Sequence, residues 1–316
     1  MPESVEQICE ESERRRALRL AGGFLALLSL TFCLIVLGAL VRANHAGLAC
    51  PDWPLCFGEF VPQIDFRIAF EWSHRVLAGG VSLGFAALAV LALWRAATRR
   101  IVARWIALAA AVLALQVLLG ALTVWKLLAA WTVTAHLLAG NAFAILLLLT
   151  ASTLRDRAVV RPPVPPAGAA ARGWIALAAV LLGVQVALGG LVSARFAGLA
   201  CPEWPACNGG VWFPAWQGSV GLHLLHRLNA YALLAVLVAA AVAGRGSPRL
   251  RAPTRLALCL GVAQVSVGIA NVLLEIPVEV TGLHSALATS LVLTVTLAAR
   301  EVGSARPAAP AGAGCY

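Results

Sequence analysis

Apolar residues in this chain come in long runs rather than in the spaced pattern of a soluble helix or the alternating pattern of a strand. Eight such runs contain almost no charged side chains, and polar segments separate them. A run of about 20 apolar residues is long enough to cross a bilayer as one helix. The pattern therefore predicts eight transmembrane helices, near residues 19–41, 68–93, 102–124, 129–151, 173–194, 219–243, 253–274 and 280–299.

The composition agrees with an integral membrane protein and excludes two other classes. The 316 residues are 61% hydrophobic and 12% charged, with a mean hydropathy of +0.87, whereas soluble domains are nearer one quarter charged. A transmembrane β-barrel would show short alternating segments, which this sequence lacks. The net charge of +10 does not indicate a nucleic-acid partner, because the arginines gather between the apolar runs, where basic residues set membrane orientation.

The arginine clusters predict how the chain crosses the bilayer. They precede the first run, follow the eighth, and lie between runs two and three, four and five, and six and seven. Because basic residues favour the cytoplasmic side, we expect a multi-pass protein of the cell (plasma) membrane with both termini cytoplasmic. The first run is too long for a typical signal peptide and has a counterpart in the fifth, so we interpret it as a retained helix.

The two halves of the chain repeat each other. The segment GLACPDWPLC at residues 47–56 returns as GLACPEWPAC at residues 198–207. Each half contains four predicted helices, so both halves enter the membrane from the same side, as in a parallel repeat. We therefore predict an all-α fold of two pseudo-symmetric four-helix bundles.

The same reasoning divides the chain into five parts. They are a cytoplasmic N-terminal segment 1–18, a first four-helix repeat 19–153, a Pro-rich cytoplasmic linker 154–172, a second four-helix repeat 173–300 and a disordered tail 301–316.

Four of the six histidines belong to the repeat, each near the outer end of an even-numbered predicted helix: His74, His136, His226 and His284. An ionisable residue inside a membrane span indicates function by default. Two imidazoles at matching depth in a helix bundle can bind both faces of one haem iron. The alternative is that each histidine makes only an interhelical hydrogen bond. Zinc is disfavoured because no third or fourth ligand has suitable spacing.

Three charged residues lie beside these histidines. Arg75 and Arg227 each follow a candidate ligand, and a guanidinium fits either a haem propionate or simple extension to the membrane interface. The halves differ three residues before the ligand, where the first half has Glu71 and the second has His223. A carboxylate beside a haem can transfer protons, so we favour a catalytic Glu71 over one that only anchors its helix or pairs with Arg75.

The repeated loops each contain two cysteines on the side predicted to be extracytoplasmic, where disulfides persist. We expect the bonds Cys50–Cys56 and Cys201–Cys207. Each bond either shapes a lid over the pocket or forms a redox-active pair, and we favour the first because the spacing matches no specific redox motif. The unrepeated cysteines are interpreted as ordinary residues, and His45, which has no repeat partner, as a loop or interfacial residue.

With these motifs the chain resembles the haem A synthase family. The resemblance covers residues 20–300 and depends on an ordered set of motifs rather than on one decisive motif. The set comprises EWSHR (residues 71–75), WTVTAHLLAGN (131–141), LLHRLNA (224–230), TGLHSALA (281–288) and the two cysteine loops.

The resemblance implies an activity and an assignment of the two halves. The family oxidises the C8 methyl of haem O to a formyl group by two successive hydroxylations, after which the hydrated aldehyde loses water. It implies that Glu71, His74 and His136 hold the substrate haem O, and that His226 and His284 hold a resident haem b. It also implies haem O synthase and cytochrome oxidase as partners. Since some relatives lack the cysteines, the pairs are not essential to the chemistry in every member.

Three rival functions are compatible with the residues alone. They are a bis-His cytochrome b that only carries electrons, a membrane thiol–disulfide oxidoreductase and a haem carrier without turnover. The electron donor, the oligomeric state (a homo-oligomer is compatible with the sequence) and the role of His223 are open at this stage.

Overall fold

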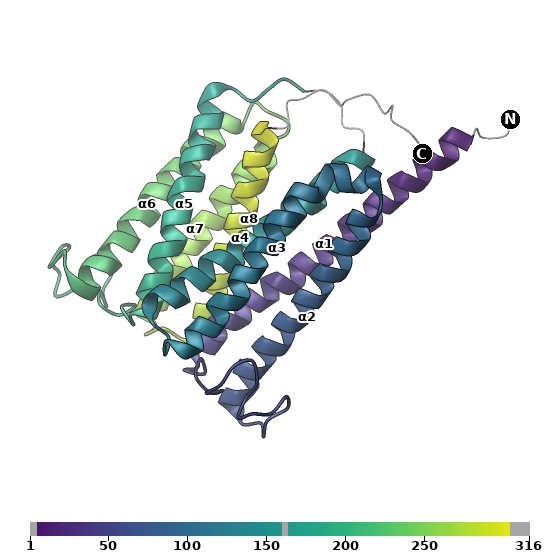
Figure 1. The fold of residues 1–316 in the computed structure, drawn as a ribbon. Coiled ribbons are helices and arrows are strands. Elements are labelled where there is room, and N and C mark those ends of the chain that lie inside the picture. Colours follow the sequence, from purple (N-terminus) through teal and green to yellow (C-terminus); the bar gives the residue numbers. More distant parts are fainter. Residues whose placement is uncertain (1–4, 160–163, 304–316) are drawn as a thin grey trace.

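The computed structural model describes residues 5–159 and 164–303, and within these ranges the chain is built from eight long helices and no named strand (Figure 1). All eight are long and apolar enough to cross a membrane, which confirms the predicted all-helical membrane fold. The helices are α1 (Val5–Ala43), α2 (Phe66–Trp94), α3 (Ala96–Trp125), α4 (Ala130–Ala158), α5 (Ala169–Ala194), α6 (Gly218–Gly244), α7 (Arg251–Leu273) and α8 (Val278–Gly303).

Most helices extend beyond the apolar runs that predicted them. Helix α1 begins at Val5, α4 continues to Ala158, and α8 continues to Gly303, because backbone hydrogen bonding in a helix does not end where the apolar run ends. The predicted N-terminal segment, linker and tail are therefore helical at their described edges. Residues 1–4, 160–163 and 304–316, on which the rest of those predictions falls, lie outside the described residues.

The connections sort to the two ends of the molecule. The long α1–α2 and α5–α6 loops project at one end, here called the loop end, and α1 begins and α8 finishes at the opposite end (Figure 1). The tight α3–α4 and α7–α8 turns use paired residues in the left-handed backbone region: Leu127 with Leu128, and Glu275 with Ile276. Both long loops thus lie at the same end of the bundle, as the even number of spans per half requires.

Each half arranges its four helices in the same neighbour order. In the first half α1 contacts α2 and α4, and α3 contacts α2 and α4; in the second half α5 contacts α6 and α8, and α7 contacts α6 and α8. The halves meet where α1 contacts α8 and where α4 contacts α5 and α8. A pseudo-symmetric repeat requires this matching order of helix neighbours. That the two halves form such a repeat stays a prediction.

The larger clusters of buried apolar residues lie away from the loop end. In the first half a cluster of buried residues includes Phe24, Phe85 and Phe143, the last two meeting edge to face with centroids 5.4 Å apart. In the second half Leu182 and Leu237 belong to the matching cluster. Each cluster takes residues from the parts of the helices remote from the long loops, so the loop end of each half remains available for polar side chains.

Candidate functional site

The four repeat histidines lie near the starts of α2, α4, α6 and α8, toward the loop end. Electrostatic interactions link His74 with His136 and His226 with His284. The structure therefore brings together one pair of imidazoles in each half, from the two even-numbered helices, and haem ligation by these pairs stays a prediction.

Each of these imidazoles packs against a glycine on the helix that precedes it in the chain. A Cβ added to the glycine would lie only 3.1–3.2 Å from the ring carbon Cε1, closer than nearly all real Cβ contacts. The pairs are Gly38 with His74, Gly120 with His136, Gly189 with His226, and Gly268 with His284. Each ring thus occupies space that any side chain larger than hydrogen would contest, so its orientation depends on that glycine.

Three of the four rings also meet a glutamine amide. The Nε2 atoms of Gln116 and Gln264 lie 3.2 Å from Nε2 of His136 and His284 respectively, and Nε2 of Gln185 lies 3.2 Å from Nδ1 of His226. Each glutamine stands four residues before the glycine under the same ring, in the segments QVLLG (116–120), QVALG (185–189) and QVSVG (264–268). Helical spacing places both residues on one face.

The buried polar atoms left over at this level fit a haem iron better than a structural metal. The Nδ1 atoms of His74, His136 and His284 are buried without a hydrogen-bond partner, although buried polar groups are almost always paired. Among residues 5–159 and 164–303 no group of three or more His, Cys, Asp and Glu side chains could hold a metal ion. Two imidazoles without further ligands suit an iron whose other positions a porphyrin fills.

Glu71 is buried on α2, with only 7% of its surface exposed. Its Oε1 accepts a hydrogen bond from Nε of Arg75 at 2.9 Å, and the pair forms an ion pair along the helix. A buried carboxylate needs such a partner. The structure therefore contains the pairing with Arg75 that was the alternative to catalysis, and this contact also fixes the carboxylate about one turn from His74.

The two arginines are occupied by loop backbone. Arg75 donates to the carbonyl oxygens of Asp52 at 2.7 Å and Cys50 at 3.1 Å, and also to that of Leu55. Arg227 donates to the matching carbonyls of the second loop, which are those of Cys201 at 2.7 Å, Glu203 at 2.9 Å and Ala206 at 3.1 Å. Both guanidinium groups thus fasten a loop to its helix, a role that neither sequence interpretation included.

Both predicted disulfides are present. Cys50–Cys56 and Cys201–Cys207 have S–S distances of 1.95 and 2.02 Å, and all four residues are at most 1% exposed. Thiol–disulfide exchange requires an accessible sulfur, so the burial favours a loop-shaping role over a redox-active one.

Each loop is closed further by an acidic residue between its cysteines. The carboxylate of Asp52 accepts from the backbone N–H groups of Phe57 at 2.7 Å and Gly58 at 2.8 Å. Glu203 accepts from Gly209 at 2.9 Å and Gly210 at 3.0 Å. The Gly58 and Phe57 N–H groups lower the pKa of Asp52 below its usual range, and the Gly210 and Gly209 N–H groups do the same for Glu203.

The two remaining histidines have separate environments. His223, at the position matching Glu71, is buried, and its Nδ1 lies 2.9 Å from the carbonyl oxygen of Ala197. His45 lies in the α1–α2 loop, with its ring stacked on Phe196 at 6.2 Å between centroids. His223 thus ties its helix to the adjoining loop, whereas the exposed His45 contacts a ring of the second half, that of Phe196.

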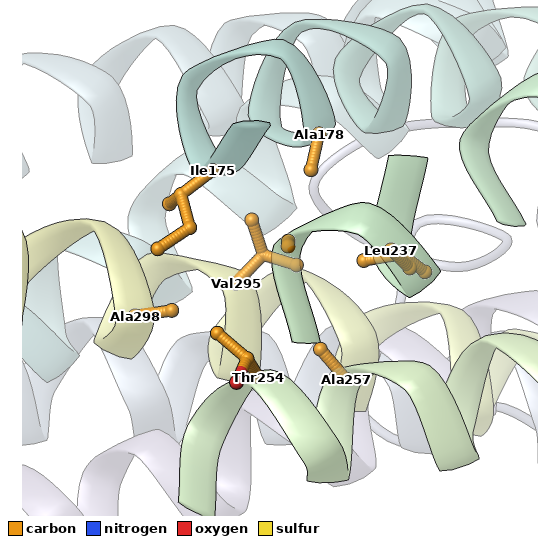
Figure 2. Close-up of a pocket in the computed structure, with 8 residues that line it drawn as sticks. Ile175, Ala178, Leu237, Thr254, Ala257, Val295 and Ala298 are labelled. Atoms are coloured by element: carbon orange, nitrogen blue, oxygen red, sulfur yellow. The ribbon is translucent and has the colours of Figure 1, made fainter. Parts of the chain in front are cut away.

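A small cavity lies elsewhere, between α5, α6, α7 and α8 (Figure 2). It is lined by apolar side chains, including Ile175, Leu237 and Val295, and by Thr254. Its free volume is about 10 Å³, and the Thr254 hydroxyl donates to Leu250 within its own helix. A space of this size holds at most one water molecule, so it is not a cofactor site.

Sequence reasoning missed the partners of the imidazoles more than the imidazoles themselves. Gln116 and Gly120 recur in the second half as Gln264 and Gly268, but the sequence analysis gave none of them a role, and it did not recognise Gln185, Gly38 or Gly189. A search for the shared pattern Gln-Val-x-x-Gly within the chain would have found Gln185. The glycine on α1 lacks that signal, because Leu34 stands where the other segments have glutamine.

Comparison with known proteins gives one family. The family model described as cytochrome oxidase assembly protein, COX15-CtaA, matches residues 23–70 and 63–296. These ranges include all eight spans except the first part of α1 and the last part of α8.

Individual relatives agree along nearly their whole length. The chain is 30% identical to a protein named Heme A synthase from Shewanella oneidensis, covering 84% of this chain and 91% of that one. It is 30% identical to the Heme A synthase of Shouchella clausii over 83% and 89% of the two chains, and 28% identical to that of Rhizobium etli over 89% of both. The chain therefore belongs to the COX15-CtaA family of cytochrome oxidase assembly proteins, and it is similar to these haem A synthases.

Proposed function

We propose that this protein is a haem A synthase, which oxidises the C8 methyl of haem O to a formyl group within the membrane. The observation that carries the proposal is the pairing of imidazoles, one pair per half, each ring seated on a glycine of the preceding helix. Membership of the family supports the reaction, and the relatives' names support the product.

The two halves take different tasks. In the first, His74 and His136 would hold the substrate haem O, with Glu71 close along α2. In the second, His226 and His284 would hold a resident haem b, which supplies one-electron chemistry when bound. The division is supported by an exchange beside the ligands, where the first half has the carboxylate Glu71 and the second half has His223 at the equivalent position.

Glu71 is the residue we assign to proton transfer. Its carboxylate is buried and held by Arg75 at 2.9 Å, so it stays in one place while substrate is bound. A positioned acid or base of this kind contributes about 10²–10⁴-fold to rate. Arg75 and Arg227 hold the loops over the two sites. Contact of either guanidinium with a haem propionate, as the sequence suggested, stays a prediction.

The membrane arrangement follows from the arginine clusters. We place the loop end on the extracytoplasmic side of the plasma membrane, with both termini in the cytoplasm, since basic residues gather at the opposite end. Haem O synthase and cytochrome oxidase are the proposed partners, as supplier of the substrate and receiver of the product.

Pigment analysis tests the proposal. The protein is expressed together with a haem O source and purified, and its haems are identified by mass. Haem A, or a haem heavier than haem O by one or two oxygen atoms, is the expected result. Haem b alone, unchanged haem O in the presence of reductant and oxygen, or the lack of any haem absorbance would overturn it. The double variant His226→Ala/His284→Ala is expected to lose haem b while it retains the first site.

A further inference from the structure

The α5–α6 loop exposes a group of aromatic side chains beyond its disulfide. Trp212, Phe213 and Trp216 are each more than half exposed, and so is Val211 before them. The rings of Phe213 and Trp216 stack with their centroids 5.5 Å apart. Residues 211–216 are here called the aromatic tip. Exposed apolar groups gathered in this way mark a surface that contacts another protein or a membrane.

The aromatic tip belongs to a long uncharged stretch of the chain. No Asp, Glu, Lys or Arg occurs from residue 204 to residue 226. The matching segment of the first half, residues 53–74, contains four charged residues, which are Glu59, Asp65, Arg67 and Glu71. Protein interfaces have a polar, solvent-accessible rim, whereas lipid penalises any charge that enters it. The lack of charge around the aromatic tip therefore favours lipid over a protein as its partner.

The first loop has an apolar counterpart of the aromatic tip, but charges flank it. Phe60, Val61 and Ile64 are exposed at the matching positions. Glu59 stands directly before them and Asp65 directly after them, and both are exposed. The Asp65 carboxylate is held in place, because it accepts a hydrogen bond at the start of α2. Insertion of this counterpart into lipid would draw fixed charges toward the membrane.

The second loop also lies against the lipid-facing side of α6. Nε1 of Trp204 donates to the hydroxyl oxygen of Tyr231 at 3.0 Å. Tyr231 is exposed on this membrane-spanning helix, and it shares an exposed stripe with Leu228 and Val238 at helical spacing. A side chain exposed on such a stripe faces lipid. The loop that contains the aromatic tip therefore continues a surface that the bilayer already covers.

The first loop lacks this contact with its own helix. The position that matches Tyr231, four residues after the arginine that holds the loop, is Gly79 in the first half. Trp53 instead meets the ring of Trp125 at the end of α3, with centroids 6.0 Å apart. The two loops thus share their disulfides and their arginine contacts, and differ in how they lie against the lipid-facing surface.

Tryptophan and tyrosine favour the headgroup level of a bilayer, where the apolar body of the ring meets lipid and its polar edge meets water. We propose that the aromatic tip inserts into the headgroup region of the leaflet at the loop end and anchors the second half there, while the charged first loop stays in water. The inference involves no haem, so it stands apart from the proposed function.

Photo-crosslinking tests the proposal. The photoreactive residue p-benzoylphenylalanine replaces Trp212 in the full-length protein, which is reconstituted into phosphatidylcholine vesicles and irradiated. The intact mass of the product then identifies what the side chain touched, and we expect an increase by the mass of one phospholipid. Leu83 is 75% exposed on the membrane-spanning α2, so the same replacement there is the positive control and should give the same adduct.

Phe60 is the matched site in the first loop. Isolated β-bridges join Cys56 to Glu59 and Asn208 to Val211, so the chain makes the same turn immediately before Phe60 and before Trp212. Phe60 is 84% exposed, so the replacement disturbs no packing there. We expect the yield of lipid adduct at Phe60 to be several-fold lower than at Trp212.

Three outcomes would overturn the proposal. The first is the lack of a lipid adduct at Trp212 when Leu83 gives one. The second is an adduct with the mass of a second protein chain, which would make the aromatic tip an interface between copies. The third is an equal yield of lipid adduct at Trp212 and Phe60, which would remove the distinction between the loops. Phe213 offers a second site for the probe, with the same expected adduct, if the Trp212 variant does not fold.

Discussion

Arg227 on α6 repeats the contacts that Arg75 makes on α2. Each guanidinium donates to three carbonyl oxygens of the adjacent disulfide loop, at Cys50, Asp52 and Leu55 in one case and at Cys201, Glu203 and Ala206 in the other. Only Arg75 also binds a carboxylate, that of Glu71. The first loop is therefore mechanically joined to the proposed proton carrier, and the second loop is not.

Replacing Arg227 with lysine should loosen the second loop without changing the charge. A lysine ammonium lacks the planar fork that reaches three carbonyls, and a hydrogen bond from a charged group is worth about 1.5–3 kcal/mol. We expect Arg227→Lys to lower the melting temperature and to speed reduction of Cys201–Cys207 by a soluble phosphine. An unchanged reduction rate would show that the contacts do not hold the loop, and a loss of haem b with an intact loop would favour propionate binding instead.

The glycines under the imidazoles can be tested on α5, which offers a matched pair. A Cβ at Gly189 would lie 3.2 Å from Cε1 of His226, whereas a Cβ at Gly183 would have no atom within 4 Å. An open Gly→Ala change in a helix gains up to about 1 kcal/mol. We therefore expect Gly183→Ala to be neutral or stabilising, and Gly189→Ala to lower the melting temperature and shift the electron paramagnetic resonance spectrum of the ferric haem.

A second background separates the ring contact from general helix packing. In His226→Ala protein the ring is gone, so Gly189→Ala should no longer differ from Gly183→Ala in its effect on melting temperature. If Gly189→Ala is equally harmful with and without the imidazole, the glycine serves the packing of α5 rather than the orientation of His226.

Much of the framework could be predicted from the sequence because the membrane imposes it. A membrane-spanning helix needs about 20 mostly apolar residues in a row, so the spans are visible as apolar runs. Ionisable residues such as His74 are conspicuous within these runs. The contacts of Arg75 were not predictable, since they depend on where the carbonyls of a folded loop point. Gly38 was missed because nothing in its own segment indicates which imidazole faces it. Leu34 was missed because a repeat is recognised by identical residues, and Leu34 replaces the glutamine that the other segments contain.

Acid should open the disulfide loops. The pKa of Asp52 is lowered by N–H groups of Gly58 and Phe57, and that of Glu203 by those of Gly210 and Gly209. A carboxylate whose pKa is lower in the folded state stabilises that state above the ordinary carboxyl range, about pH 4, and this contribution is lost as the pH falls through the folded value. Reduction of Cys50–Cys56 by phosphine should therefore accelerate, relative to a small model disulfide, below about pH 4.

The two loops serve as controls for each other in that experiment. Asp52→Asn should make Cys50–Cys56 reduce rapidly even at neutral pH and flatten its pH profile, and it should leave the profile of Cys201–Cys207 unchanged. Glu203→Gln should do the reverse. If the reduction rates of both disulfides in the unsubstituted protein change with pH only as the rate of the model disulfide does, the carboxylates do not close the loops.

Replacing Glu71 with glutamine should separate haem binding from haem conversion. The amide oxygen can still accept the hydrogen bond that Arg75 Nε donates at 2.9 Å, and the side chain keeps its size, so the loop contacts of Arg75 should persist. What is lost is the ability to take up and release a proton, and such a loss typically costs about 10²–10⁴-fold in rate. We expect Glu71→Gln protein to bind haem O at the wild-type level and to accumulate it unconverted.

The comparison that decides the role of Glu71 is with Arg75→Lys. If Glu71 only anchors Arg75, Glu71→Gln keeps the hydrogen bond and should convert haem O at close to the wild-type rate, and only Arg75→Lys should loosen the first loop, depress conversion and let Cys50–Cys56 be reduced faster. If Glu71 transfers protons, Glu71→Gln should abolish conversion while its disulfide stays as resistant to phosphine as in the wild type. Conversion by Glu71→Gln at the wild-type rate would remove this residue from the chemistry and leave the paired imidazoles without a proton carrier on α2.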